Sequence, residues 1–169
     1  MAVVSSAEAG FNAIQKGATI VQLRGPNLTA RELEREAGWL VPKAAVPVIV
    51  SSRCDIALAA GAAGVNLPEH DIGVADARSL LGQRLVGRSV HSVAAARAAE
   101  AEGADFVIFG PVWASPSHPG QEPRGVAALT EIAQAVRIPV IAIGGVTSER
   151  TAECTSAGAA GFAAITMFQ

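Results

Sequence analysis

Short apolar runs alternate with amphipathic segments along almost the whole chain. Val46-Pro-Val-Ile-Val50, Phe106–Phe109 and the residues after Pro139 are nearly free of polar side chains, which is typical of strands buried on both faces. The segments between these runs place apolar residues at helical spacing, and several begin with Ser or Thr, which are preferred at helix N-termini. A regular alternation of strand and helix predicts a parallel sheet covered by helices.

The pattern predicts eight strands, each except the last followed by a helix. Strands are expected at 2–5, 19–24, 46–50, 64–67, 85–89, 106–109, 138–143 and 161–166. Helices are expected from Ser5 to Gly17, from Thr29 to about Leu40, after Ser92, and over 55–60, 74–81, 126–136 and 147–156. Ser5-Ser-Ala-Glu8 and Thr29-Ala-Arg-Glu32 are capping-box patterns, which predict where the first two helices begin.

Eight strand–helix units predict a single domain over residues 1–169 that folds as a (β/α)8 TIM barrel. The alternative is a doubly wound open sheet, but no Gly-x-Gly-x-x-Gly motif follows the first strand. Barrels usually need at least ~200 residues, and this chain has 169. We therefore expect a barrel shortened at both ends, with a stub of a first strand and no final helix.

Composition and charge narrow the functional classes. Half of the residues are hydrophobic and 4% are aromatic, and the net charge is -2, so neither nucleic acid nor an anionic membrane is an expected partner. Cys54 and Cys154 are isolated thiols without metal-ligand spacing, as expected in a reducing compartment. No apolar run reaches ~20 residues, and no signal peptide is recognisable at the N-terminus. These features predict a cytoplasmic protein.

A glycine pair follows the seventh predicted strand. Gly144 and Gly145 leave the backbone bare, and Thr147 with Glu149 indicates a helix start. Strand, glycines and helix N-terminus together favour an anion site, although Gly-Gly alone could be a tight turn. Thr166 ends the eighth strand, and the loops after strands seven and eight form the common phosphate site of barrels. A phosphate site at Gly144, Gly145 and Thr166 is therefore predicted.

Other polar residues follow the remaining strands, at the end where barrels carry their active sites. They are Gln22, Arg24, Ser51, Ser52, Asn66, Asp71, Ser89, His91, Ser115, Ser117 and His118. Gln22 and Arg24 should share one face, because side chains alternate along a strand. His91, which follows the fifth predicted strand, is expected to face away from the pocket, and His70 to be exposed.

Several motifs resemble thiamine phosphate synthase and its TenI relatives, in the right order along nearly the whole chain. They are Val21-Gln-Leu-Arg24, Arg53-Cys-Asp-Ile-Ala57, Gly64-Val-Asn-Leu67, Gly87-Arg-Ser-Val-His-Ser92, Gly103-Ala-Asp105, Phe109-Gly-Pro111, Ile143-Gly-Gly-Val146 and Gly158-Ala-Ala-Gly161. The resemblance implies a barrel of thiamine biosynthesis that binds a hydroxyethylthiazole phosphate. Its phosphate would meet Gly145, Ile165 and Thr166, with Ser115 and Ser117 opposite. Gln22, Arg24, Ser51 and Ser89 would line the pocket for a pyrimidine or other ligand.

The chain departs from the synthase pattern where charge is needed. Gly25-Pro26 replaces one family lysine, Ser51-Ser52 replaces an Asn-Asp pair whose Asp binds magnesium, and His118 replaces a second lysine. Only Asp71 keeps a metal-ligand place, so magnesium is expected only if synthase activity survives, and no other cofactor is expected. A leaving diphosphate needs its charge neutralised, and these losses weigh against synthase activity.

The resemblance leaves three functions open. A TenI-like thiazole tautomerase needs an acid/base rather than a metal; Pro111 stands at the family's histidine, and His118 on the same loop could substitute unless it is a solvated loop residue. The alternatives are thiamine-phosphate synthase and a non-catalytic thiazole-phosphate-binding regulator. From the sequence, tautomerase is the leading interpretation.

The short C-terminal end predicts an association. If Thr166 faces the site, Ala163, Ile165 and Met167 should face outward on the eighth strand, with no helix to cover them. An uncovered apolar strip does not normally stay in water. Either the chain is a truncated form of a longer protein, or a second subunit covers this strip. Of the two, we predict a homodimer with its seam near Met167 and the first helix.

Overall fold

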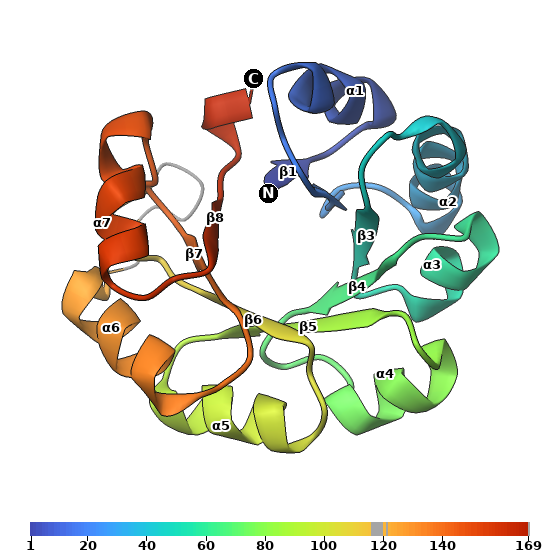
Figure 1. Ribbon diagram of the computed structural model, residues 1–169. Coiled ribbons are helices and arrows are strands. Elements are labelled where there is room, and N and C mark those ends of the chain that lie inside the picture. The colour runs from blue at the N-terminus through green and yellow to red at the C-terminus, as the bar shows by residue number, and fades with distance from the viewer. Residues whose placement is uncertain (116–119, 121, 169) are drawn as a thin grey trace.

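Parallel strands form a barrel in which every strand lies beside its neighbour in sequence. The computed structural model describes residues 1–115, 120 and 122–168, and in this part of the chain the sheet has eight strands in the order β1 to β8 (Figure 1). They are β1 (Ala2–Val4), β2 (Val21–Leu23), β3 (Val48–Ser51), β4 (Gly64–Leu67), β5 (Leu85–Val90), β6 (Phe106–Phe109), β7 (Val140–Ile143) and β8 (Gly161–Ala163). The predicted (β/α)8 barrel is confirmed.

The helices surround the sheet. They are α1 (Ala7–Gln15), α2 (Ala30–Leu40), α3 (Cys54–Ala60), α4 (Val74–Leu81), α5 (Val93–Ala101), α6 (Gly125–Ala135) and α7 (Thr151–Ser156). Short 3-10 turns are η1 (Val41–Lys43), η2 (Ser148–Arg150) and η3 (Thr166–Phe168). The helical layer is open between α7 and α1, where η3 lies (Figure 1). None of the helices in the described part of the chain is long and apolar enough to cross a membrane.

Three hydrogen bonds close the barrel between β8 and β1. The Met1 amine donates to Phe162 O (2.7 Å), Val3 N donates to Ala164 O (2.9 Å) and Ala164 N donates to Met1 O (3.1 Å). Burial at this seam lowers the pKa of the Met1 amine, because desolvation penalises its charged form. The stub strand β1 therefore completes the sheet despite its three residues.

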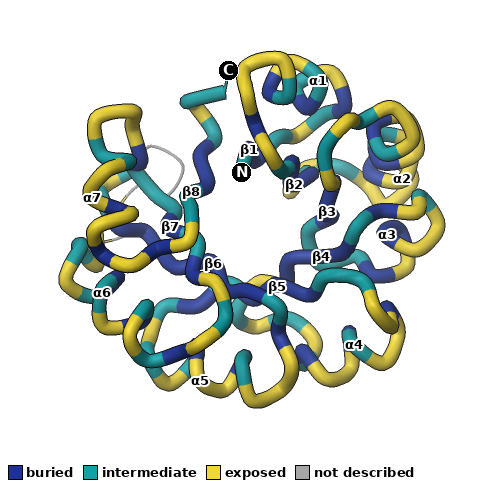
Figure 2. Tube along the Cα trace, in the orientation of Figure 1, coloured by how far each residue is buried: buried dark blue, intermediate teal, exposed yellow. Residues whose placement is uncertain are grey.

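The core has an inner and an outer part. Inside the barrel, Ile49, Phe106 and Ile108 pack with Ile141 and Ile143; outside it, a larger cluster joins the strands to the helices. Figure 2 shows this as buried strands within helices whose outer faces are exposed. Gly87 lies beside Phe106 in the sheet, and a Cβ there would overlap the Phe106 ring. The glycine thus makes room for a large side chain in the barrel interior.

Helix starts agree with the sequence in one case and differ in another. Thr29 caps α2 in a full capping box with Glu32, and the Thr29 amide that donates to Glu32 lowers the pKa of that carboxyl. The predicted box at Ser5 and Glu8 is wrong. Ser6 is the N-cap of α1, and its hydroxyl accepts from Ala9 N at 3.2 Å, because the helix begins one residue later than the pattern indicated.

The predicted orientation of the eighth strand is also wrong. Ala163 pairs with Ile143, and both line the cavity at the barrel mouth, so Ala163 faces inward and Phe162 outward. Phe162 and Met167 pack against the outer core, and no large exposed apolar side chain lies on β8 among the described residues. The chain leaves the strand after Ala163 and turns into η3, so strand alternation no longer applies at Thr166. The homodimer stays a prediction without the bare strip that motivated it.

The two serines at the start of α1 provide a matched test of its cap. We expect Ser6→Ala to lower the free energy of unfolding by about 1 kcal/mol, because the Ala9 amide loses its acceptor. Ser5→Ala should change it by less than ~0.5 kcal/mol, as for an ordinary surface substitution. Urea unfolding of both variants measures the difference. Equal destabilisation by the two changes would contradict the assignment of Ser6 as the cap.

Candidate functional site

The predicted site residues surround a cavity of ≈ 400 Å³ at the carboxyl ends of the strands. Its lining includes nine of them: Gln22, Arg24, Ser51, Ser89, Ser115, Gly144, Gly145, Ile165 and Thr166. Gln22 and Arg24 both line it, as the strand alternation predicted. Ser117 and His118 lie outside the described residues. The binding roles of all these residues stay predictions, but the structure places the nine around one space.

Bare backbone forms the β7–β8 side of the cavity. Gly144 and Gly145 have φ values of 94° and 65°, which favour glycine. A Cβ on Gly144 would lie 2.6 Å from Pro111 Cα, and one on Gly145 would lie 2.6 Å from Ala114 O. The residues after β6 therefore pack directly on this backbone. Any side chain at Gly145 would therefore disturb the fold there.

Five amides on this side have no hydrogen-bond acceptor within the part of the chain that the structure describes. They belong to Gly144, Gly145, Val146, Ile165 and Thr166, all of which line the cavity. Four of these residues are buried or half-buried, where an N–H group needs an acceptor, and Thr166 is exposed. Clustered amides bind anions through their aligned dipoles. This side of the cavity, which we call the amide end, is suited to a phosphate group.

The segment after the glycine pair differs from the expected helix start. Thr147 precedes the 3-10 turn η2 rather than an α-helix, and its side chain makes no capping hydrogen bond. The same segment supplies a cation that sequence reasoning missed. Arg150 lines the cavity, donates from Nη1 to Gly145 O at 2.7 Å and lies 5.1 Å from the Trp113 ring centroid. The pattern Gly-Gly followed five residues later by Arg was the signal available in the sequence.

The β2–β5 side of the cavity carries two buried amide side chains. Gln22 Nε2 donates to Ser51 Oγ at 2.7 Å, and Asn66 Nδ2 donates to Ser89 Oγ at 3.0 Å. Gln22 and Asn66 are each 3% exposed. Their carbonyl oxygens have no partner among the described atoms, which is costly unless a ligand or water supplies a donor. We call this side the acceptor end.

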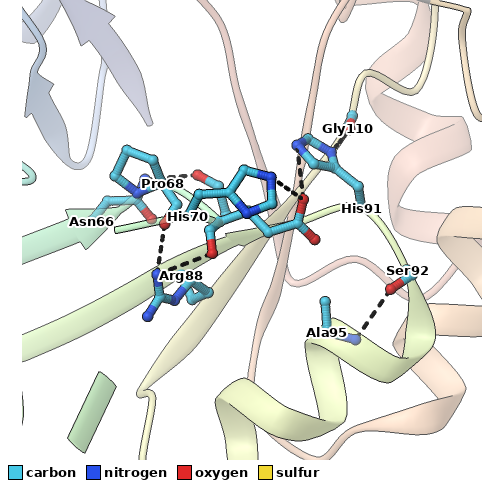
Figure 3. Close-up of polar contacts among 10 residues, drawn as sticks. Asn66, Pro68, His70, Arg88, His91, Ser92, Ala95 and Gly110 are labelled. Atoms are coloured by element: carbon cyan, nitrogen blue, oxygen red, sulfur yellow. Dashed lines mark hydrogen bonds and ion pairs between the residues drawn. The ribbon is translucent and has the colours of Figure 1, made fainter. Parts of the chain in front are cut away.

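A histidine and a carboxylate line the wall between the two ends. His91 lines the cavity, so the expectation that it faces away is wrong. Its Nδ1 lies 2.5 Å from Gly110 O, and its Nε2 lies 3.8 Å from Glu69 Oε2 (Figure 3). His70 is exposed, as expected. Glu69 also lines the cavity and was missed from the sequence because it matches no motif.

The described residues do not fit a magnesium ion held by the protein alone. Asp71 does not line the cavity, and its Oδ1 accepts from Ile72 N at 2.8 Å. Across residues 1–115, 120 and 122–168, no three His, Cys, Asp or Glu side chains gather as metal ligands. Pro111, which stands at the family's histidine position, lines the cavity without offering a proton.

Arg150 allows a direct test of the amide end. We expect Arg150→Gln to weaken the binding of inorganic phosphate by about 10- to 100-fold, because a hydrogen bond to a charged group contributes roughly 1.5–3 kcal/mol. Arg137→Gln is the control, since Arg137 is exposed and precedes β7 at the opposite end of the barrel. Calorimetry measures both. An equal loss in the two variants, or none in Arg150→Gln, would place the anion elsewhere.

Comparison by sequence with known proteins points to one family. The family model described as thiamine monophosphate synthase matches residues 5–168. A putative thiamine-phosphate synthase of Geobacter sulfurreducens is 44% identical over 98% of this chain and 77% of its own length. A putative thiamine-phosphate synthase 2 of Aquifex aeolicus is 40% identical over 92% of this chain and 85% of its own.

The solved structure of a thiamine phosphate pyrophosphorylase from Pyrococcus furiosus has the same fold. It superposes with a TM-score of 0.87 at 30% identity, over 98% of this chain and 84% of that one. The family resemblance drawn from the motifs is thereby confirmed. This chain belongs to the thiamine monophosphate synthase family, which includes the TenI proteins.

Proposed function

We propose that this protein is a thiamine-phosphate synthase, which joins a pyrimidine diphosphate to a hydroxyethylthiazole phosphate in the cavity at the barrel mouth. The relatives that carry this name support it, and so does the enzyme class of the structural neighbour. The observation that carries the proposal is that the cavity has two differently built ends. A synthase needs two ligand sites, whereas a tautomerase needs one.

The amide end suits the thiazole phosphate. Its five amides and the Arg150 guanidinium present donors and positive charge to one part of the cavity. Charge-assisted hydrogen bonds to phosphate are among the stronger contacts a protein makes. Because Trp113 stacks on Arg150 and the 113–114 backbone packs on Gly145, these donors are held in place before the ligand arrives.

The acceptor end suits an aminopyrimidine. The unpartnered oxygens of Gln22 and Asn66 need N–H donors, which an exocyclic amine supplies. A hydrocarbon ligand would leave these atoms buried and unpaired, at a cost of about 1–3 kcal/mol each.

In the reaction, the thiazole nitrogen forms a C–N bond to the pyrimidine methylene while the methylene C–O bond breaks. The electron pair of that bond leaves with the diphosphate. Arg24, which lines the same cavity, supplies positive charge for the departing group. The missing lysines make this charge smaller than the family pattern provides, so a slow enzyme is expected. The protein also holds the thiazole and pyrimidine rings in contact, and this proximity by itself raises the reaction rate greatly.

Thiazole tautomerase is the second candidate function, because the cavity contains a possible acid/base pair. His91 and Glu69 give the cavity a group that can exchange protons, although Pro111 holds the place of the family's histidine. A regulatory protein that binds without turnover is the third. Magnesium belongs to the synthase proposal as a counter-ion of the diphosphate, which it pairs with in solution.

The deciding experiment follows products in two mixtures. The protein is incubated with the thiazole phosphate and the pyrimidine diphosphate, with and without magnesium, and separately with the thiazole phosphate carboxylate. Formation of thiamine phosphate in the first mixture is the expected result. Double-bond migration in the second mixture alone, followed by NMR, would favour tautomerase instead. Binding with no product in either would leave the regulatory role.

If the acceptor end binds the pyrimidine, a substitution there should change the KM values of the two substrates by different amounts. Asn66→Leu should raise the KM for the pyrimidine diphosphate by about tenfold, the effect of one lost hydrogen bond, and leave the KM for the thiazole phosphate within twofold or so. Asn12→Leu, a change of the same kind on the exposed face of α1, is the control. A larger rise for the thiazole phosphate would reverse the assignment of the two ends.

A further inference from the structure

We propose that His91 is a general acid that protonates the departing diphosphate, with Glu69 as its positioning residue. This rests on the proposed synthase function. The two residues lie outside the amide end and the acceptor end, and neither has a part in the synthase reaction as described so far. Their arrangement is drawn in Figure 3, where dashed lines join His91 to Gly110 and to the carboxylate beside His70.

The Gly110 carbonyl fixes which ring nitrogen carries the exchangeable proton. A carbonyl oxygen only accepts, so the 2.5 Å contact with Nδ1 requires a hydrogen on Nδ1. The other nitrogen, Nε2, is then the one that gains and loses a proton. Imidazole is the side chain best suited to exchange protons near neutral pH. His91 is therefore oriented like an acid/base group, with one nitrogen anchored and one available.

Glu69 is held so that it faces Nε2. Its loop, between β4 and α4, is fixed by Arg88, which is 7% exposed and donates from Nη1 to Pro68 O at 2.6 Å and from Nη2 to Ile72 O at 2.5 Å. These bonds flank Glu69 on both sides in the sequence. A buried guanidinium that uses its donors on loop carbonyls indicates that this loop has a defined position. The carboxylate can then steady the ring and stabilise its positive charge.

His91 lies where the pyrimidine substrate carries its leaving group. It is two residues beyond Ser89, whose hydroxyl accepts from Asn66 at the acceptor end, and it anchors on Gly110 at the end of β6. A diphosphate cannot lie on the apolar floor of Ile108 and Ile143, so it projects along the polar wall. Nε2–H gives its proton to the diphosphate oxygen that receives the C–O electron pair. His91 becomes neutral and regains a proton from water.

This step offsets the charge that the chain lacks. Protonation removes one negative charge from the leaving group, as a lysine would have neutralised one by pairing. Several charged or titratable groups surround His91. Glu69 lies beside its ring, with His70 beyond that carboxylate, and Arg24 and Arg150 line the same cavity. A second hollow that His91 also lines contains Glu122, Arg124 and Glu131. Glu69 is the one in contact with Nε2.

The test compares His91→Gln with His70→Gln, the latter an exposed histidine on the neighbouring loop. We expect His91→Gln to lower kcat by about 10²–10⁴-fold, with both KM values within about twofold, and His70→Gln to behave as the parent. In the parent protein kcat should fall as pH rises and His91 loses its proton; this limb should disappear in His91→Gln. Glu69→Gln should shift the pH at which kcat falls, and it should lower kcat by a smaller factor than His91→Gln does.

A substrate whose leaving group needs no proton makes the test specific. With a pyrimidine methyl halide, corrected for its reaction in buffer, His91→Gln should match the parent. Thermal unfolding of each variant checks the fold, and His91→Asn serves if the glutamine variant is unstable. An unchanged kcat and pH profile in His91→Gln, with an active parent, would overturn this proposal alone. A parent that makes no thiamine phosphate would overturn the synthase function and this proposal with it.

Discussion

Closure of the sheet between β8 and β1 is the constraint on which the site depends. Strands of only three residues make this seam, and their hydrogen bonds through Met1, Val3 and Ala164 are what join the two edges. Without closure, Val3 and Gln22 on one side would not face Ala163 and Ile165 on the other. The cavity at the barrel mouth exists because eight strand ends are brought into one ring.

The cavity then separates two kinds of polar group around that ring. Strands β7 and β8 end in bare backbone with unpaired amides, while β2 to β5 end in side-chain amides and hydroxyls. Donors gather where an anionic ligand is expected and acceptors where an amine is expected. This separation supports a reaction between two substrates, and it is why the synthase interpretation now stands ahead of the tautomerase that the sequence favoured. The wall between the ends holds His91 and Glu69, which the sequence placed elsewhere or missed.

Periodicity was sufficient for the barrel because each buried strand and amphipathic helix carries its own local signal. The site was predictable where it depends on backbone, as at Gly144 and Gly145, or on strand alternation, as at Gln22 and Arg24. It was not predictable where a loop supplies the residue, as at Glu69. His91 lies two residues beyond Ser89, so alternation along β5 places both on the cavity side. The Gly110 carbonyl and the Glu69 loop then orient its ring. The predicted orientation of β8 was wrong because nothing in the sequence marks the change from strand to 3-10 turn after Ala163.

The most direct test of the account is an amide NMR titration with the hydroxyethylthiazole phosphate. If the phosphate binds at the amide end, the amide signals of Gly144, Gly145, Val146, Ile165 and Thr166 should shift together and saturate with one affinity. Those at the opposite end of the barrel, such as Gly103 and Arg137, should not move. Saturable shifts confined to other residues, with these five unchanged, would contradict the central claim that the unpaired backbone of β7 and β8 binds the phosphate.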